Sequence, residues 1–282
     1  MNDQARPMRG WNIFYPSDFS PASEVAFAHA LKLALLAQAE LSILHVASQP
    51  KDVQWTDFPG VRRTLERWGI LPPGSAREDV AEMGMNVTKI VQLHTDPVRA
   101  ILAYLMQHPT NLIVLATHQR EGLARWMHKA AAQPIARHAG ELTLFVPGGV
   151  AGFVSLETGA LTLGRIVIPL DTVPRPQPAV AAAFALAGAL GCAAAAFTLV
   201  HVGDKEEMPT VHLPERDGWT WEQTVRHGEV VEQILQVAAE RSADLIVMTT
   251  QGHHGFLDAL RGSTTERVLR GARCPLLAVP AA

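Results

Sequence analysis

The chain has 282 residues, enough for two domains that each bury a core of their own. Hydrophobic residues make up 48% and charged residues 18% of it, and its net charge is −3. This composition is typical of a globular protein, and it argues against a disordered chain, a nucleic-acid-binding protein or a polybasic membrane-surface module. Two cysteines, Cys192 and Cys274, are too few for a disulfide framework and lack metal-ligand spacing. With no apolar signal segment after Met1, a cytoplasmic protein is expected.

Short apolar runs alternate with helical stretches along the chain. In the first half, the runs around residues 13–16 and 44–46 predict strands. In the second half the pattern predicts strands at 165–169, 196–202, 220–226, 244–249 and 275–279. Helices are expected between them at 177–191, 229–241 and 263–272, and a polar excursion at 203–218. Strands that are apolar throughout and separated by helices indicate a parallel sheet covered on both faces.

One stretch has the length of a membrane span. Residues 176–203 contain no Asp, Glu, Lys or Arg, and a bilayer needs only about 20 apolar residues. The stretch is rich in alanine, is interrupted by Gly188 and Gly191, and becomes β-branched toward its end. We therefore expect a buried helix followed by a buried strand, and no membrane partner.

The two halves of the chain repeat each other. Residues 94–147 align without gaps on residues 227–280, with 14 identities in 54 positions that fall at the expected strands and turns. Upstream, the segment from Ile13 to Asp18 matches the segment from Ile166 to Asp171, and Leu44-His45-Val46 matches Val200-His201-Val202. The sequence thus predicts an α/β fold with two tandem doubly wound parallel-sheet domains, at 1–147 and 165–282. Residues 148–164 are expected to form an ordered connection between them, such as a hairpin, because they carry apolar residues to bury.

Ligands of doubly wound sheets bind at the carboxyl ends of the strands. In the second half, the strand at 244–249 is followed by Gln251-Gly252-His253-His254-Gly255, and Gly262-Ser263-Thr264 precedes a helix. Glycines let the backbone approach a ligand, and free N–H groups at a helix N-terminus bind phosphate. Ser263 and Glu266 also form a capping box, so the serine has a purely structural interpretation as well. The chain lacks both the Walker loop and the Gly-x-Gly-x-x-Gly dinucleotide fingerprint.

These segments together resemble the universal stress protein family. The resemblance rests on Pro16-Ser17-Asp18-Phe19-Ser20, on the His-Val pairs, on Gly252-x2-Gly255 leading to Gly262-Ser263, and on the final run from Pro275 to Pro280. It covers both halves, so the chain is similar to a tandem member. It implies the adenine nucleotide α-hydrolase-like fold and a cytoplasmic stress-response protein that binds ATP, AMP or ADP, with or without Mg²⁺. The family's nucleotide-binding pattern has nine residues between the second glycine and Gly-Ser, whereas this chain has six.

The resemblance also implies which residues bind the nucleotide. Asp171 and Val202 would contact adenine and ribose. Gln251, Gly252 and Gly255 would lie along the ribose and phosphates, and Gly262, Ser263 and Thr264 would bind the phosphates. In the first copy Asp18 and Val46 are kept, but Gln119, Lys129 and Ala130 replace Gly252, Gly262 and Ser263. We therefore expect one competent nucleotide site, in the C-terminal half, and one degenerate copy. Asp171 also suits a turn before Pro174 and Pro176, and both interpretations stay open.

Other chemistry is weakly indicated. His253 and His254, with His201 or His212, invite a metal site, but adjacent histidines lack helical i, i+4 ligand spacing, so no metal site is predicted. His45 and His201 are expected to be structural, hydrogen-bonded histidines. No nucleophile elbow or carboxylate pair indicates a catalytic residue. Four tryptophans are assigned to the divergent segments between the second and third strands, to pack there or to close over a ligand: Trp55, Trp68, Trp219 and Trp221.

The leading hypothesis is a regulatory or signalling protein that binds adenine nucleotide in its C-terminal half and is not an enzyme beyond slow ATP hydrolysis. A ligand-free interaction module, favoured by the shortened spacer, and a slow nucleotide hydrolase are the alternatives. The expected protein partner is unidentified. Pairing of residues 142–146 with residues 276–279 would make the chain an intramolecular pseudo-dimer. Further dimerisation of whole chains is left open.

Overall fold

The computed structural model describes residues 10–20, 23–117, 141–250 and 264–281. Their backbone forms one sheet of ten strands in the order β3-β2-β1-β4-β5-β10-β9-β6-β7-β8. In the first half the strands are β1 (Asn12–Pro16), β2 (Glu40–Ala47), β3 (Asn86–Leu93), β4 (Leu112–Thr117) and β5 (Leu142–Pro147). In the second they are β6 (Arg165–Leu170), β7 (Ala195–Val202), β8 (Trp219–Arg226), β9 (Leu245–Thr250) and β10 (Leu276–Pro280). The predicted α/β class with two doubly wound parallel halves is confirmed.

The two halves join through β5 and β10, which pair antiparallel with Leu144 opposite Leu277. The other strand pairs of the sheet are parallel. This is the predicted pairing of residues 142–146 with 276–279, and the chain is therefore a pseudo-dimer. Because β5 and β10 are antiparallel, the strands of the two halves run in opposite directions. The carboxyl ends of the strands in one half therefore lie on the same side as the amino ends of the strands in the other.

The repeat is visible in the secondary structure. Three elements of the first half recur with identical bounds 133 residues later: β3 as β8, β4 as β9, and α4 (Pro97–Gln107) as α7 (Val230–Glu240). Even the caps correspond, because the side chains of Asp96 and Glu229 accept hydrogen bonds from the first backbone N–H groups of α4 and α7. The predicted strands and helices of the second half lie within two residues of the observed ones where the structure describes them.

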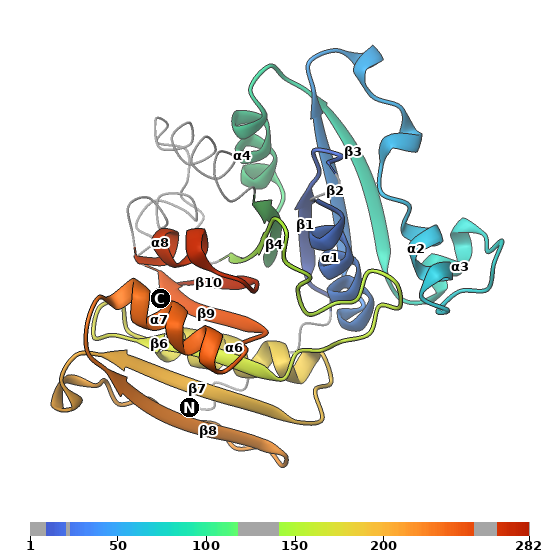
Figure 1. The fold of residues 1–282 in the computed structure, drawn as a ribbon. Helices are drawn as coiled ribbons and strands as arrows, with labels where there is room; N and C mark the ends of the chain where they lie inside the picture. Colours follow the sequence, from blue (N-terminus) through green and yellow to red (C-terminus); the bar gives the residue numbers. More distant parts are fainter. Residues whose placement is uncertain (1–9, 21–22, 118–140, 251–263, 282) are drawn as a thin grey trace.

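Helices cover both faces of the sheet (Figure 1). One face buries α1 (Ser23–Ala37) and α6 (Gln177–Ala189) in a core that runs through both halves. The other face packs against α4, α7 and α8 (Thr264–Gly271). Successive strand residues alternate between these cores, so Ile13 and Tyr15 contact the first and Phe14 the second. The charge-free stretch forms α6 and β7, as predicted, and Cys192 and Cys274 are buried thiols. None of the described helices is both long and apolar enough to cross a bilayer.

The connection after β5 is ordered and docks on the first half. Val154 and Leu161 form an isolated antiparallel bridge, the minimal form of the predicted hairpin. Phe153 is fully buried against His29 of α1, with ring centroids 4.4 Å apart. Gly152 lies against the same ring, where a Cβ would come within 2.2 Å of His29 Cε1. A glycine at φ +69° is therefore required there for both backbone and space.

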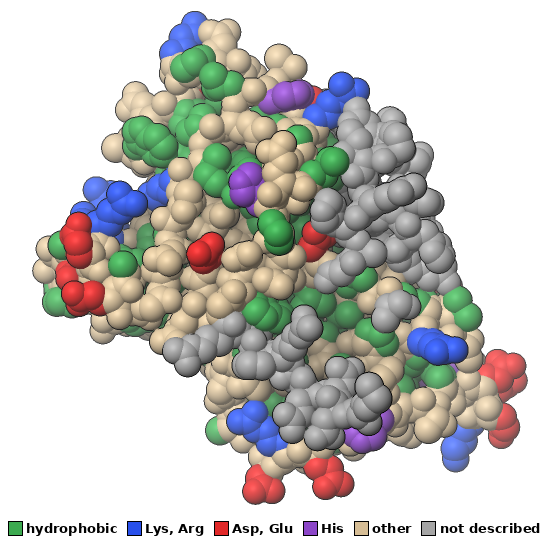
Figure 2. Space-filling view, turned by 180° about the vertical axis from the view of Figure 1, so that it is seen from behind, with side chains coloured by type: hydrophobic (Ala, Val, Ile, Leu, Met, Phe, Trp, Pro, Cys, Tyr) green, Lys and Arg blue, Asp and Glu red, His purple; other side chains and the backbone are tan. Residues whose placement is uncertain are grey.

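The halves differ most between their second and third strands. In the first half this segment contains two short helices, α2 (Val61–Arg67) and α3 (Arg77–Glu82). Charged side chains of both signs gather over them in the space-filling view (Figure 2). Trp68 is buried at the end of α2, and its indole N–H donates to Leu156 O of the connection at 3.0 Å. Trp219 and Trp221 lie within β8 and pack on Phe197, which corrects their assignment to the preceding segment.

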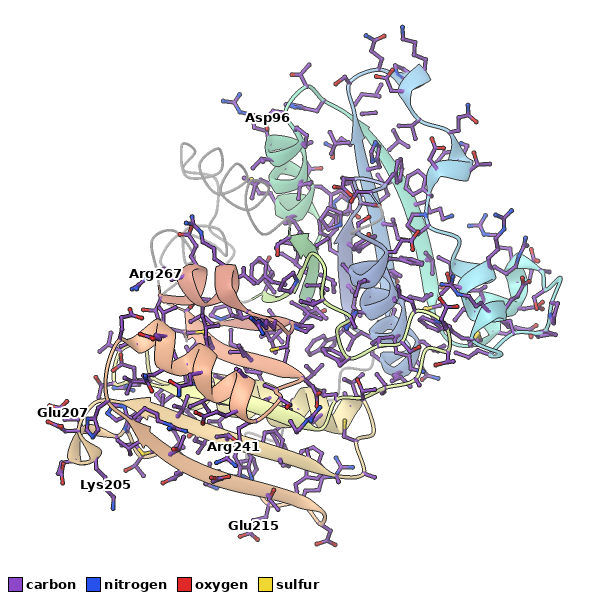
Figure 3. The ribbon with its side chains drawn as sticks, in the orientation of Figure 1. Asp96, Lys205, Glu207, Glu215, Arg241 and Arg267 are labelled. Carbon is purple, nitrogen blue, oxygen red and sulfur yellow. The ribbon has the colours of Figure 1, made fainter. Side chains whose placement is uncertain are left out.

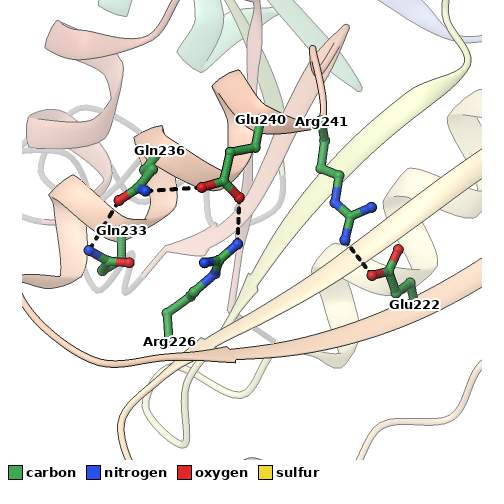
Figure 4. A network of polar contacts seen from close by, with 6 residues as sticks. All are labelled: Glu222, Arg226, Gln233, Gln236, Glu240 and Arg241. Carbon is green, nitrogen blue, oxygen red and sulfur yellow. Dashed lines mark hydrogen bonds and ion pairs between the residues drawn. The ribbon is translucent and has the colours of Figure 1, made fainter.

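Polar contacts hold the outer strand β8 under α7 (Figure 4). Arg226 forms an ion pair with Glu240 at 2.5 Å, and Gln236 donates to the same carboxylate at 3.0 Å. Arg241 pairs with Glu222. On the inner side, the Asp244 carboxylate accepts hydrogen bonds from Gly164 N and Arg165 N and forms an ion pair with the Arg165 guanidinium. Charged residues on an edge strand also discourage pairing with a further chain.

Candidate functional site

The strand order reverses between β6 and β9. From β6 the chain runs to β7 and β8 on one side and then returns to β9 on the other side of β6. In open α/β sheets, the crevice outside the carboxyl ends of the strands at this reversal is where ligands bind. Three members of the predicted site lie among the described residues: Asp171, which follows β6 directly, Val202 and Thr264.

The register of β6 and β7 brings Asp171 and Val202 side by side. Leu170 pairs with His201, so the residues that follow these two lie next to each other at the carboxyl edge. The Asp171 side chain is exposed, and its Oδ1 accepts hydrogen bonds from Thr172 N at 2.6 Å and Thr172 Oγ1 at 3.4 Å. Oδ1 of Asp171 thus stabilises the turn after β6. The side chain is also exposed to solvent at the strand ends, so both interpretations of Asp171 are compatible with its position.

Helix α8 begins at Thr264, which is exposed. The remaining predicted site residues lie outside the described residues: Gln251, Gly252, Gly255, Gly262 and Ser263. Helix α8 is tied to its surroundings by charged contacts. Arg270 pairs with the buried Glu266, and Arg267 pairs with Glu229 at 2.5 Å. The pKa of the Glu229 carboxyl lies below its ordinary value, chiefly because Glu232 N donates a hydrogen bond to it. Figure 3 shows Arg267 on α8, and Lys205 and Glu207 on the segment that follows β7.

The two ring nitrogens of His201 have different surroundings, and only Nδ1 makes the hydrogen bond expected of a structural histidine. Its Nδ1 lies 3.1 Å from Leu170 O, and since a carbonyl oxygen only accepts hydrogen bonds, Nδ1 carries the proton. Nε2 is the second nitrogen of the ring. It is buried without a hydrogen-bond partner among the residues that the structure describes. Sequence reasoning anticipated the first bond and missed the unsatisfied second nitrogen, because nothing local in the sequence reports which side chains surround a ring.

The corresponding residues of the first copy share one hydrogen bond with the second copy and otherwise make different contacts. His45 Nδ1 lies 2.7 Å from Ser17 O, which is the same bond as in the second copy. Asp18 Oδ1 accepts hydrogen bonds from Ser20 N at 3.0 Å and Ser20 Oγ at 2.7 Å. The Phe19 ring stacks on the His45 ring. The predicted loss of the phosphate loop in this copy involves Gln119, Lys129 and Ala130, which lie outside the described residues.

A separate groove of about 1500 Å³ opens in the first half between α2–α3 and the strands β2 and β3. Its lining carries charges of both signs. The basic residues are Arg62, Arg63, Arg67, Arg77 and Lys89, and the acidic ones are Glu24, Glu40, Asp57 and Glu78. Burial lowers the pKa of the Lys89 ammonium, which lies 5.6 Å from the centre of the Phe58 ring. Among the residues that the structure describes, no group of three His, Cys, Asp or Glu side chains could hold a metal ion.

Comparison with known proteins identifies relatives of both halves. The sequence profile of the universal stress protein family matches residues 12–147 and 214–280. A universal stress protein of Methanocaldococcus jannaschii is 43% identical over 58 residues, which are 19% of this chain and 34% of that protein. Universal stress protein A homolog 1 of Coxiella burnetii is 39% identical over 70 residues, which are 25% of this chain and 44% of that protein. The chain thus matches less than half the length of either relative.

Solved structures show the same fold across nearly the whole chain. A universal stress protein from Archaeoglobus fulgidus covers 98% of this chain and 100% of its own, with a TM-score of 0.58 and 14% identity. A functionally unknown protein from Pseudomonas aeruginosa covers 99% of this chain and 95% of its own, with a TM-score of 0.60 and 13% identity. At these identities the likeness concerns the fold alone.

Proposed function

Since the chain belongs to the universal stress protein family, we propose that it is a regulatory protein that binds ATP or a related adenine nucleotide in its C-terminal half. The observation that carries the proposal is the register of β6 and β7, which sets Val202 beside Asp171, and Asp171 follows β6, the strand at which the strand order reverses. We place the ligand at these two strand ends and assign its remaining contacts to residues between 251 and 264. The function would be exerted by binding, in the cytoplasm, with a protein partner responding to the occupied state.

In this proposal the base and ribose contact Asp171 and Val202. The ribose and phosphates lie along Gln251, Gly252 and Gly255, and the phosphates are bound by Gly262, Ser263 and Thr264. Backbone N–H groups and the positive end of the α8 dipole favour phosphate at that position without a lysine. Any Mg²⁺ would come with the phosphates of the nucleotide and be held chiefly by them.

The proposal keeps the predicted division of the chain. Residues 1–147 form the degenerate half, residues 148–164 the connection, and residues 165–282 the nucleotide-binding half. It is supported by the ends of the strands, because β5 ends at Pro147 and β6 begins at Arg165.

A thermal-unfolding titration with ATP and Mg²⁺ tests the proposal. A ligand that binds only the folded state stabilises it by RT ln(1 + [L]/Kd), about 2.7 kcal/mol at a hundredfold excess over Kd. We expect a saturable rise in Tm for the wild type and none for the double variant Gly262→Asp/Ser263→Ala. The matched control is Lys129→Asp, which places the same charge at the equivalent position of the first copy and should leave the rise intact.

Three outcomes would contradict the proposal. An unchanged affinity in the Gly262→Asp/Ser263→Ala variant would show that the phosphates bind elsewhere. No rise in any of the three folded proteins would favour the ligand-free interaction module. Turnover of ATP well above background that depends on Asp171 would instead favour the nucleotide hydrolase.

A further inference from the structure

The groove beside β3 reflects a difference in side-chain size between the two halves. Helices α2 and α3 lie next to this edge strand (Figure 1). The matched His-Val pairs at the ends of β2 and β7 make Leu41 equivalent to Phe197. Leu41 pairs with Val87 of β3, and Phe197 pairs with Trp221 of β8. The register therefore makes Val87 equivalent to Trp221, one residue away from what the bounds of the two strands give, and both pack against the same core.

Two tryptophans of the second half stand where the groove lies in the first. Trp221 stacks on Phe197 with ring centroids 4.1 Å apart, and Trp219, two residues earlier, is buried. The equivalent positions of the first half carry Val87 and Met85, and both line the groove. Because valine and methionine are smaller than tryptophan, this face of the sheet is left open toward α2 and α3.

Strand β3 also places a cation on this face. Side chains two residues apart on a strand share a face, so Lys89 lies on the same face as Val87 and Val91, which pack against the first core. By the register of the sheet, the counterpart of Lys89 on β8 is the neutral Gln223. A charge that is partly withdrawn from water costs free energy unless an opposite charge accompanies it.

Lys89 has no such opposite charge beside it. Among the residues that the structure describes, no carboxylate forms an ion pair with Lys89. Its Nζ lies 5.6 Å from the centre of the Phe58 ring, a contact that compensates for the lost water only in part. The other charged residues of the lining are exposed, whereas Lys89 is partly buried. The charge that lies inside the groove is therefore a single cation.

We propose that this groove is a second ligand site of the chain and binds an aromatic monoanion, whose negative group lies beside Lys89 and whose ring lies on the apolar lining. The groove has a volume of about 1500 Å³, whereas small-molecule pockets usually have about 300–1000 Å³. Such a ligand fills a part of the groove, and Lys89 marks which part. Trp55, which is 66% exposed and stacks on Phe58, adds an open ring surface to the lining.

The site is separate from the proposed nucleotide site, because none of its lining residues belongs to the C-terminal half. Its ligand differs as well. A single cation matches one carboxylate or sulfonate group, whereas a nucleotide brings several negative charges on its phosphates.

Fluorescence titration with two probes tests the charge of the ligand. One probe is 8-anilinonaphthalene-1-sulfonate, an aromatic monoanion, and the other is N-phenyl-1-naphthylamine, which has the same rings without the sulfonate. We expect the wild type to bind one equivalent of the sulfonate. Lys89→Met should weaken its binding by about tenfold or more and leave the affinity for the neutral amine unchanged. Lys51→Met is the matched control, since Lys51 is exposed and lies outside the lining, and it should bind both probes like the wild type.

A second variant tests the place of binding. Val87→Trp introduces the tryptophan of the second half and should abolish the binding of both probes. Leu93→Trp is its matched control, because Leu93 lies on the same strand, is 52% exposed and lies outside the lining. Thermal unfolding verifies that each variant is folded, and Val87→Phe replaces Val87→Trp if the larger ring prevents folding.

The results that would overturn the inference are distinct from those that bear on the nucleotide site. No binding of the sulfonate by the wild type, or equal affinities in wild type, Lys89→Met and Val87→Trp, would show that the groove is not its site. Equal losses of both probes in Lys89→Met would refute the role of the cation. Displacement of the sulfonate by ATP would place the probe in the nucleotide site, whereas a failure of ATP to bind leaves the expected probe titrations unchanged.

Discussion

His29 gives the folded protein a pH dependence whose sign can be worked out from its contacts. Its ring is fully buried on α1, with Nδ1 2.7 Å from Val25 O, and Nε2 accepts a hydrogen bond from Phe153 N at 3.0 Å. Protonation would replace the acceptor at Nε2 by an N–H that faces another N–H. Burial lowers the pKa of His29 to about 4.

The lowered pKa makes stability fall as the solution is acidified. Between pH 6.5 and pH 4 the unfolded chain binds a proton at His29 that the folded chain does not, so the free energy of unfolding decreases as pH falls through this window. With an ordinary value of 6.5 and a folded value of about 4, linkage gives a loss of about 2 kcal/mol between pH 7 and pH 5. Below pH 4 the full loss is about 3 kcal/mol.

Another buried group has the opposite effect. Burial raises the pKa of the Glu141 carboxyl to about 7, so its contribution to stability is present below pH 4.5 and is lost as pH rises through 7. The two effects partly cancel in the wild type. The informative comparison is therefore between the wild type and His29→Gln, in which only the histidine is removed.

Urea unfolding at pH 7, 6 and 5 measures this comparison. The stability difference between wild type and His29→Gln should shift by about 2 kcal/mol toward the variant on going from pH 7 to pH 5. Glu141→Gln should shift the other way, with the variant gaining on the wild type as pH rises. Parallel pH profiles for wild type and His29→Gln would refute the reasoning, whatever their offset.

Three further predictions concern single contacts. In urea unfolding, Gly152→Ala should destabilise the protein by about 1–3 kcal/mol more than Gly149→Ala. Both glycines have positive φ, but only a Cβ at position 152 would collide with a ring, that of His29. Equal losses of stability in the two variants would contradict this prediction. Asp244→Ala, which leaves two backbone N–H groups without their acceptor, should cost about 1–3 kcal/mol and the exposed Glu222→Ala less than about 1 kcal/mol, as urea unfolding would measure. Burial raises the pKa of Cys274 to about 12, so a thiol reagent at pH 8 should label it only after denaturation.

The sequence by itself determined the repeat and the strands. Strands covered on both faces must be apolar along their whole length, so their runs can be read locally, and the constant offset of 133 residues placed β4 and α4 against their later counterparts, β9 and α7. It also predicted the joining of β5 to β10. The hydrogen bonds of His45 and His201 followed from their matched positions at strand ends.

Only the tertiary structure showed which contacts the equivalent residues of the two halves make. Asp18 and Asp171 follow matched strands, yet Phe19 stacks on His45 with Phe58 above it, and Thr172 lies open. The docking of the connection on His29 joins residues 124 positions apart. Such contacts depend on segments that approach each other only after the sheet has formed and the connecting segments have packed against it. A periodic pattern records which residues are buried, but it does not record which distant side chain buries them.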